Sequence, residues 1–289
     1  MKNVKGIILA GGQGTRLYPL TKVISKQLLP IFDKPMVYYP LSVLMLAKIK
    51  EVNIITSKDF IPSYKSLLAD GSQLGMKFNY ITQDKPRGIA EALILSKKNI
   101  GRSDICLILG DNIFYGNNLT SLLSKAKKNN KSTIFTYRVS NPQDYGVIKR
   151  INNKIVDVVE KPNKFIGNQA VVGLYFYKNH AIKIAEKLKP SKRGELEITD
   201  LNKILIKNNK INEFQLNRGN AWMDAGSFQS YLDISNMISV IQKRQSISIG
   251  CVEEIALRNK WISKKSLFKL LGKYPDNDYK KYIISILKD

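Results

Sequence analysis

GIILAGGQGTRL, residues 6–17, is an apolar strand that runs directly into a glycine-rich turn carrying an arginine. Glycines let backbone N–H groups approach phosphate oxygens closely, and the guanidinium group of Arg16 can donate two parallel hydrogen bonds to them. The segment lacks the third glycine of the dinucleotide fingerprint, because Leu17 stands there, and it lacks the Gly-Lys-Ser/Thr ending of the P-loop. It therefore predicts a phosphate-binding loop of another kind, although an isolated glycine-rich turn is also compatible with an ordinary tight turn.

Short apolar strands alternate with amphipathic segments through the first half of the chain. The predicted strands are Val4–Ala10, Val52–Thr56, Phe78–Thr82 and Ile105–Gly110, and the predicted helices are Met36–Lys48, Pro62–Leu68, Ile89–Lys97 and Leu119–Asn129. This alternation predicts an α/β fold with a mostly parallel sheet and helices on both faces. Ligands of such sheets gather at the carboxyl ends of the strands.

The pattern changes at Ser132 to strand-like runs separated by Asn-Pro, Asn-Asn and Lys-Pro-Asn turn signals. The predicted strands are Ile134–Val139, Gly146–Ile151, Ile155–Glu160 and Ala170–Tyr177, followed by helices at Ala181–Leu188 and Glu197–Lys207 and, after Gly226, by helix to the end apart from Ile247–Ile249. We expect a more antiparallel region on the same sheet. Because there is no internal repeat and no low-complexity linker, residues 1–289 are interpreted as a single domain.

The net charge of +24 by itself suggests a nucleic-acid-binding protein. The lysines, however, are spread over predicted helix faces and loop tips, and no recognition module for DNA or RNA is present, so we expect a solvated basic surface and no nucleic-acid partner. No run approaches the ~20 apolar residues of a membrane span, and Met1–Ala10 is too short for a signal sequence, so we expect no membrane partner and a cytoplasmic location. Cys106 and Cys251 give no disulfide pattern.

Further segments extend the pattern set by residues 6–17. In order they are Pro19–Lys22, Ser25–Pro30, Lys34–Leu41, Gln83–Ala92, Leu109–Gly116, Asp144–Val147, Glu160–Pro162, Gly173–Tyr177, Arg193–Asp200 and Ala221–Gly226. Together they resemble the sugar nucleotidylyltransferases over essentially the whole chain. The resemblance implies a Rossmann-like three-layer α/β/α fold with a central, mostly parallel mixed sheet, an inserted sugar-binding β region and a helical C-terminal part. It also implies a nucleotide-binding half at about 1–130, a sugar-binding half at 131–226 and an oligomerisation and regulatory part at 227–289.

The activity implied by the resemblance is the Mg²⁺-dependent transfer of a thymidylyl group from dTTP to α-D-glucose 1-phosphate. The products are dTDP-glucose and pyrophosphate, in the first step toward dTDP-L-rhamnose and related deoxysugars. Joining two phosphate esters needs charge neutralisation and in-line positioning more than a covalent nucleophile. The single histidine, His180, lies in a polar turn, so no Ser-His-Asp or Cys-His arrangement is available. We therefore expect the sugar phosphate itself to attack.

Two aspartates are the candidate ligands of Mg²⁺. Asp111 follows the apolar strand Ile105–Leu109 and a glycine, which predicts a carboxylate at the carboxyl edge of the sheet, and Asp224 is predicted on a turn between Trp222 and Gly226. Magnesium prefers one or two carboxylates together with phosphate oxygens, so a pair is chemically sufficient. Either aspartate alone could equally be a turn or cap residue. The resemblance assigns the metal to both.

The remaining roles rest on the resemblance. Arg16 and Lys26 are assigned to the departing pyrophosphate and Lys161 to the sugar phosphate, which makes them candidate catalytic residues together with the two aspartates. The nucleotide-binding set is Gly11, Gly14, Thr15, Arg16, Lys26, Gln27, Gln83, Gly88 and Asp111, and the sugar-phosphate set is Asn112, Gly146, Glu160, Lys161 and Val172. In the first set, the amide of Gln83 can pair with the edge of thymine or uracil. In isolation, Lys26 is typical of a solvated lysine and Glu160-Lys161-Pro162 of an ordinary loop.

Three residues depart from the pattern of the family members that use thymidine nucleotides. Arg87 stands where an acidic residue is usual, Glu91 where glutamine is frequent and Ala225 where threonine is common. The first two leave the nucleotide preference open, so UTP or another hexose 1-phosphate is the alternative substrate. A homologue that binds nucleotide sugars without turnover is a further alternative, although all five candidate catalytic residues are present.

The C-terminal segment Cys251–Ala256, with Arg258, is similar to the part of the family that builds subunit contacts and a second nucleotide-sugar site for feedback control. The resemblance implies a homotetramer and places Tyr115, Arg218 and Arg258 in that regulatory site. The residues alone predict only amphipathic helices, and buried core is an equal interpretation.

Overall fold

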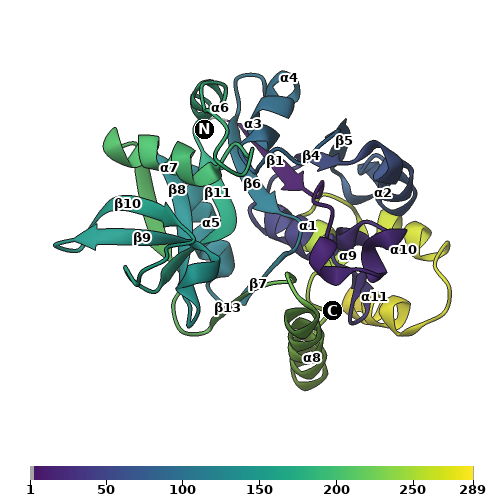
Figure 1. Cartoon of the computed structure of the whole chain (residues 1–289). Coiled ribbons are helices and arrows are strands. Elements are labelled where there is room, and N and C mark those ends of the chain that lie inside the picture. Colours follow the sequence, from purple (N-terminus) through teal and green to yellow (C-terminus); the bar gives the residue numbers. More distant parts are fainter. Residues whose placement is uncertain (1–2, 289) are drawn as a thin grey trace.

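The computed structural model describes residues 3–288, in which a nine-stranded mixed sheet lies between layers of helices (Figure 1). The strands of this sheet are β1 Val4–Leu9, β4 Glu51–Thr56, β5 Lys77–Thr82, β6 Asp104–Leu109, β8 Ser132–Arg138, β9 Gly146–Ile151, β10 Lys154–Glu160, β11 Gln169–Tyr177 and β12 Ile211–Gln215. Their order is β10-β9-β11-β6-β1-β4-β5; in addition, β8 pairs with β11, and β12 pairs with β8. The four strands predicted in the first half are confirmed.

The sheet changes from parallel to antiparallel at β6. Strand β1 pairs in parallel with β4 and β6, and β4 pairs in parallel with β5. On its other side β6 pairs antiparallel with β11, which pairs antiparallel with β8 and β9. The predicted antiparallel region therefore continues the same sheet. Strand β12, parallel to β8, was not predicted because polar residues such as Asn212 and Glu213 interrupt its apolar pattern.

The helices follow the predicted order, with shorter bounds at several ends. They are α1 Tyr38–Leu46, α2 Ile61–Leu68, α3 Glu91–Leu95, α4 Lys97–Ile100, α5 Leu119–Lys128, α6 Ala181–Ala185, α7 Ile198–Lys207, α8 Phe228–Gln245, α9 Val252–Arg258, α10 Lys264–Leu271 and α11 Asp278–Lys288. Short 3-10 turns occur at η1 Thr15–Leu17, η2 Leu20–Lys22, η3 Lys26–Leu28, η4 Lys58–Phe60, η5 Ser72–Leu74 and η6 Pro142–Asp144. Two small antiparallel ribbons pair β2 Pro30–Ile31 with β3 Lys34–Pro35, and β7 Asn112–Gly116 with β13 Asn220–Asp224.

Strand β1 shows how the layers form. Ile8 packs in a core cluster with Leu44 of α1, whereas its neighbour Ile7 packs in a second cluster with Leu93 of α3. Successive side chains of a strand point to opposite faces, so an apolar run needs a helix layer on each side. The expected α/β/α fold with a mostly parallel sheet is confirmed.

The C-terminal helices α9 to α11 form a small core of their own around Cys251, Leu267 and Ile283. The carboxylate of Glu253 in α9 is buried and accepts hydrogen bonds from Tyr274 Oη at 2.7 Å and Tyr279 Oη at 2.5 Å. These bonds hold the end of the chain against α9, which packs on α1. Helix α8 projects from the body (Figure 1).

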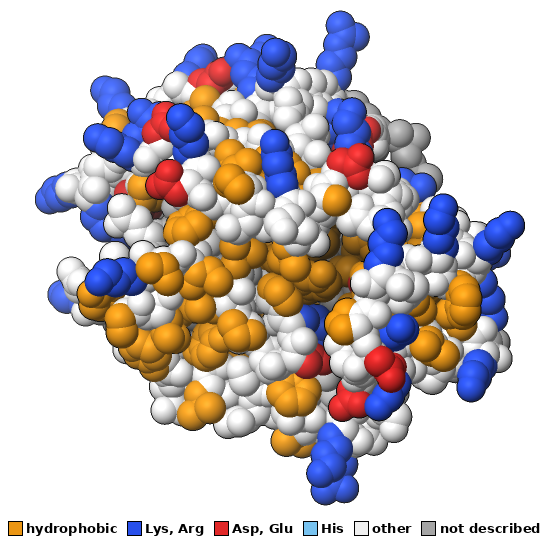
Figure 2. Space-filling model, turned by 90° about the vertical axis from the view of Figure 1, so that its right-hand side faces the viewer, with side chains coloured by type: hydrophobic (Ala, Val, Ile, Leu, Met, Phe, Trp, Pro, Cys, Tyr) orange, Lys and Arg blue, Asp and Glu red, His pale blue; other side chains and the backbone are white. Residues whose placement is uncertain are grey.

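The surface carries its positive charge in a scattered pattern. Figure 2 shows lysine and arginine side chains distributed around one face, with acidic side chains among them and apolar side chains gathered between. Within residues 3–288, no helix combines the length and apolar character that a membrane span requires. Both cysteines are buried and free.

Candidate active site

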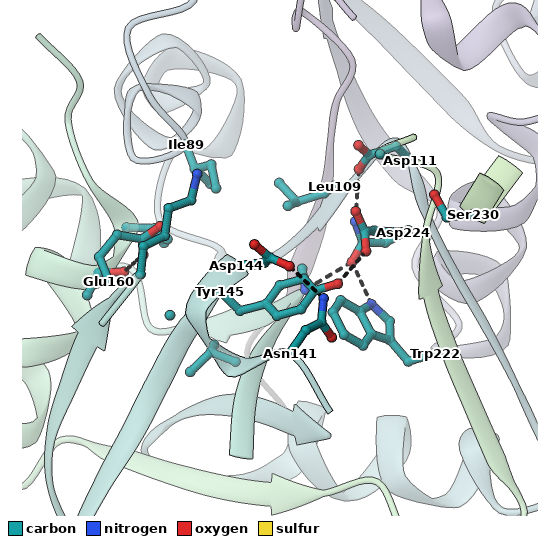
Figure 3. A pocket seen from close by; sticks show the side chains of 18 of the residues that line it. Ile89, Leu109, Asp111, Asn141, Asp144, Tyr145, Glu160, Trp222, Asp224 and Ser230 are labelled. Carbon is teal, nitrogen blue, oxygen red and sulfur yellow. Dashed lines mark hydrogen bonds between the residues drawn. The ribbon is translucent and has the colours of Figure 1, made fainter. Parts of the chain in front are cut away.

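A cleft of about 500 Å³ lies where the carboxyl end of β6 meets the antiparallel strands. Figure 3 shows Asp111 and Asp224 on one side of this cavity, Glu160 on the opposite side and Tyr145 between them. The predicted site residues that line the cleft are Arg16, Asp111, Asn112, Gly146, Glu160, Lys161 and Asp224. Residues from the glycine-rich loop and from the predicted sugar-binding half are thus brought to one cavity.

The two aspartates come together through the ribbon of β7 and β13. Asp111 follows β6 after Gly110, as predicted, but the predicted turn at Asp224 is wrong: Asp224 is the last residue of β13 and pairs with Asn112 of β7. The backbone N–H of Ala225 donates to the carbonyl oxygen of Asp111 at 3.0 Å. A backbone ladder, rather than a flexible turn, therefore fixes the relative position of the two carboxylates.

The charges around these carboxylates differ. Burial raises the pKa of Asp224, and the charge of Asp111 raises it further, against opposing effects of a Tyr145 hydrogen bond, Lys26 and Arg16. Burial would also raise the pKa of Asp111, but the ammonium group of Lys26 and hydrogen bonds from Lys26 and Asn112 hold it below its ordinary value. Lys26 is 8% exposed and forms an ion pair with Asp111 Oδ2. Asp111 is thus kept anionic by a nearly buried cation.

The donor set fits Mg²⁺ in the presence of a nucleotide. Among the described residues there is no group of three or more His, Cys, Asp or Glu side chains that could enclose a metal ion. Two carboxylates facing one polar cleft leave the other positions to phosphate oxygens and water, which is the arrangement Mg²⁺ prefers. Asp111 and Asp224 are the residues that would hold it.

Asn112 supports Asp111 from behind. Its Oδ1 accepts hydrogen bonds from Trp222 Nε1 at 2.7 Å and from the backbone N–H of Gly173 at 3.1 Å, while its Nδ2 donates to Asp111 Oδ1 at 2.8 Å. These bonds leave the buried oxygen of Asn112 engaged within the protein. The resemblance implies that Asn112 binds the sugar, which stays a prediction, and the structure adds an orienting role that was not predicted.

Tyr145 connects Asp224 to the sugar side. Its hydroxyl donates to Asp224 Oδ1 at 2.9 Å, and its carbonyl oxygen accepts from the backbone N–H of Lys161 at 2.9 Å. Burial, followed by the charge of Asp224, raises the pKa of Tyr145 to about 12, so the phenol remains a donor at neutral pH. This role was not predicted. The only signal for it in the sequence was that Tyr145 lies in Asp144–Val147, one of the segments that resemble the family.

Glu160 and Lys161 present charged groups on the opposite wall. Thr199 Oγ1 donates to Glu160 Oε2 at 2.5 Å, and Arg193 lies 3.6 Å from Glu160 Oε1. A Cβ added to Gly146 would lie 3.1 Å from Glu160 Oε2, so a side chain there would crowd the carboxylate. Lys161 is exposed and has no ion-pair partner among the described residues, which leaves its ammonium group available to an anion.

The structure places the side chain of Val172, a predicted sugar-binding residue, away from the cleft. Its side chain is fully buried in the core cluster of the opposite sheet face, whereas its neighbours Val171 and Gly173 line the cleft. The alternation of β11 is the reason, because residues one apart face opposite sides of a strand. The side chain of Val172 therefore does not face a sugar, and only its backbone remains near the cleft.

The glycine-rich loop folds around a left-handed residue. Gly14 has φ of 62° and precedes η1, and Thr21 Oγ1 donates to its carbonyl oxygen at 2.9 Å. A Cβ at Gly14 would lie 2.8 Å from Thr21, so glycine is required there. Arg16 reaches across to Gly226, at which an added Cβ would lie 3.2 Å from the guanidinium group. This places Arg16 beside Asp224.

The remaining nucleotide-binding predictions fall on residues that do not line the cleft. Gly11, Gly14, Thr15, Lys26, Gln27, Gln83 and Gly88 are absent from its lining. Gln27 is buried and accepts a hydrogen bond from Ser25 at 3.0 Å. Gly88 has φ of 100°, and a Cβ there would lie 2.5 Å from the carbonyl oxygen of Leu196. The loop before α3 is thus packed on the segment that also supports Glu160, but its contact with a base stays a prediction.

Comparison with known proteins settles the family. Residues 5–240 match the family described as nucleotidyl transferase. The chain belongs to the nucleotidyl transferase family. It is 46% identical to a glucose-1-phosphate thymidylyltransferase of Neisseria meningitidis over 287 residues (99% of this chain, 100% of that relative), and 47% identical over 290 residues to one of Xanthomonas campestris (100% and 98%). A solved structure of a UDP-glucose pyrophosphorylase complexed with UDP-glucose is 27% identical, with a TM-score of 0.73, and covers 84% of this chain and 100% of that chain.

The predicted resemblance to the sugar nucleotidylyltransferases, and with it the prediction of an enzyme, is confirmed.

Three residues of this nucleotidyl transferase were assigned to a regulatory site and lie on separate elements. Tyr115 of β7 donates to Gln245 of α8 at 2.6 Å, Arg218 is exposed before β13, and Arg258 of α9 pairs with Glu254 at 2.7 Å. Their regulatory role stays a prediction.

Proposed function

We propose that this nucleotidyl transferase moves a thymidylyl group from dTTP to α-D-glucose 1-phosphate in the presence of Mg²⁺ and releases pyrophosphate. The observation that carries the proposal is that Arg16, Asp111, Lys161 and Asp224 all line one cleft. The names of the relatives at 46% and 47% identity support the choice of substrates.

In this proposal an oxygen of the sugar phosphate attacks the α-phosphorus of dTTP, and the bond from that phosphorus to the bridging oxygen of the β-phosphate breaks. Lys161 holds the attacking phosphate, and Arg16 and Lys26 neutralise the pyrophosphate as it leaves. When bound at Asp111 and Asp224, Mg²⁺ supplies Lewis-acid stabilisation of the charge on the phosphates. Positioning and charge neutralisation are the main contributions that such a transfer needs.

Initial rates of pyrophosphate release test the proposal. The five nucleotides dTTP, UTP, CTP, ATP and GTP are each combined with glucose, galactose and mannose 1-phosphates, with Mg²⁺ and with EDTA in its place. We expect the highest kcat/KM for dTTP with glucose 1-phosphate and no turnover in EDTA. Equal or faster turnover with UTP would contradict the thymidylyl assignment, and binding without pyrophosphate release would identify a non-catalytic homologue.

The proposal includes a homotetramer located in the cytoplasm, with feedback control at a second site. Helix α8 supports an oligomer because it exposes Phe228, Leu232 and Val240 at 49%, 53% and 60%, and exposed apolar side chains grouped on one helix mark association surfaces. Light scattering after size-exclusion chromatography should give a mass of four chains. A monomer at micromolar concentration would contradict this part.

A further inference from the structure

A buried carboxylate controls the side chain of Gln83. Glu91, the first residue of α3, is 3% exposed. Its Oε2 accepts a hydrogen bond from Gln83 Nε2 at 2.7 Å and from the backbone N–H of Arg87 at 3.2 Å, and its Oε1 accepts from Arg87 Nε at 2.7 Å. Both oxygens of Glu91 are therefore engaged by donors.

An ionised carboxylate can only accept hydrogen bonds, so the nitrogen of the Gln83 amide must face Glu91 and its oxygen must face the other way. The carboxylate of Glu91 thus determines which end of the Gln83 amide faces it. The oxygen Oε1 is turned toward Gly11, where an added Cβ would collide with it. Gln83 directly follows β5, so this oxygen lies at the carboxyl edge of the sheet beside the glycine-rich loop.

We propose that Glu91 is a positioning residue that fixes the Gln83 amide with its carbonyl oxygen toward the nucleotide base, and so selects bases that carry an N–H on the ring edge. The inference rests on the proposed function. Thymine and uracil present N3–H to an acceptor, whereas the N3 of cytosine is itself an acceptor. A cytosine placed in the same way would bring two acceptors together at a buried site, and a buried acceptor without a donor is costly.

Arg87 acts behind Glu91. Its side chain is 68% exposed, and its guanidinium group contacts Glu91 Oε1, on the side away from the oxygen that holds Gln83. Arg87 therefore pairs with the carboxylate without touching the Gln83 amide. Because thymine and uracil have the same ring edge, this device rejects cytosine and does not distinguish dTTP from UTP.

The variant Glu91→Leu tests the inference. It removes both acceptor oxygens from the buried position beside Gln83, so the nitrogen of the Gln83 amide loses its partner and the amide can turn that nitrogen toward the base. We expect kcat/KM for CTP relative to dTTP to rise by about ten-fold or more, the size of one buried hydrogen bond made or broken. An unchanged ratio, in a variant with the wild-type melting temperature, would overturn the inference.

Arg87→Gln is the matched control, because it removes the guanidinium group and leaves the carboxylate that accepts from Gln83. Its ratio of CTP to dTTP use should stay at the wild-type value, and a rise equal to that of Glu91→Leu would show that the ion pair, not the acceptor, sets the base preference. Wild-type turnover separates this test from that of the proposed function. Failure of the wild-type protein to use any nucleotide would refute the function, whereas normal dTTP turnover in the wild-type protein with an unchanged ratio in Glu91→Leu would refute only the role of Glu91.

Discussion

The two walls of the cleft are built from different parts of the chain and by different means. The nucleotide wall, where we expect dTTP to bind, uses loops that follow the parallel strands β1 and β6 and that bring Arg16 and Asp111 to the cleft. The sugar wall, where we expect the sugar phosphate to bind, uses the antiparallel strands β9 to β11. Thr199 donates to Glu160 at the end of β10, and the backbone N–H of Lys161 donates to the carbonyl oxygen of Tyr145. Phosphates can be bound by repeated backbone N–H groups, whereas hydroxyls and a single ester phosphate need individual side chains. The two walls meet at Asp111 and Asp224.

Asp111→Asn should have the largest effect because it removes a charge that both walls share. Several kcal/mol of charge stabilisation would be lost, so we expect kcat to fall on the order of a thousand-fold with the fold intact. Asp144→Asn is the control, since Asp144 lines the same cleft but accepts its hydrogen bond from Asn141. Initial rates as a function of Mg²⁺ check the prediction. Turnover of Asp111→Asn within a few-fold of wild type would mean that the metal is held elsewhere.

Lys161→Ala should affect the sugar wall alone. Loss of one charge-assisted contact predicts a rise in the KM for glucose 1-phosphate of about ten- to a hundred-fold, with the KM for dTTP unchanged. Lys161→Arg keeps the charge and should recover part of the loss. Steady-state kinetics with each substrate varied in turn provide the measurement. A change in the KM for dTTP alone would show that Lys161 contacts the nucleotide and not the sugar phosphate.

Tyr145→Phe sharpens the comparison, because Tyr145 joins the sugar wall to Asp224. Removing its hydroxyl leaves the backbone bond to Lys161 and deletes the bond to Asp224 together with an interaction with Asn141. Loss of such an outer contact predicts about a ten-fold increase in the Mg²⁺ concentration needed for half-maximal activity. Mn²⁺ binding followed by electron paramagnetic resonance in the presence of dTTP gives a second readout. Tyr175→Phe, in the same cleft but without a bond to either aspartate, should leave both values unchanged, and equal effects of the two variants would contradict the role of Tyr145.

Substitutions at Val171 and Val172 test which side chains of β11 point into the cleft and which point into the core. Their expected effects are the smallest. Val172→Ala should lower the free energy of unfolding by about 1–3 kcal/mol because it leaves a cavity in the core. Val171→Ala should lower that free energy by less, because Val171 is only partly buried, and should instead shift the KM for glucose 1-phosphate. Urea denaturation and kinetics on both variants decide. The reverse assignment of effects would show that Val172 faces the cleft.

Much of the fold could be predicted because buried parallel strands are continuous apolar runs, as in β1 and β6. Strand β13 could not be predicted in the same way. It pairs with β7 in a ribbon outside the main sheet, and its sequence Asn220-Ala-Trp-Met-Asp224 shows neither a long apolar run nor a regular alternation. The interpretation of Asp224 as a turn residue was wrong for this reason.

The charged residues of the site could be predicted, but the hydrogen bonds that orient them could not. Arg16, Asp111, Lys161 and Asp224 do line one cleft. The bonds that orient them join residues far apart in the chain, such as Trp222 and Asn112, which are 110 positions apart. One sequence gives no signal for such pairs, because hydrogen bonding between side chains depends on how distant strands are brought together.

The stereochemistry at the α-phosphorus tests the central claim most directly. The wild-type protein would be supplied with one diastereomer of dTTP carrying sulfur at the α-phosphorus, together with glucose 1-phosphate and Mg²⁺, and the configuration of the product would be determined by ³¹P NMR. A single in-line displacement across the cleft predicts inversion. Retention would require an intermediate in which the protein itself carries the nucleotide, and it would contradict direct attack by a sugar phosphate held on the opposite wall.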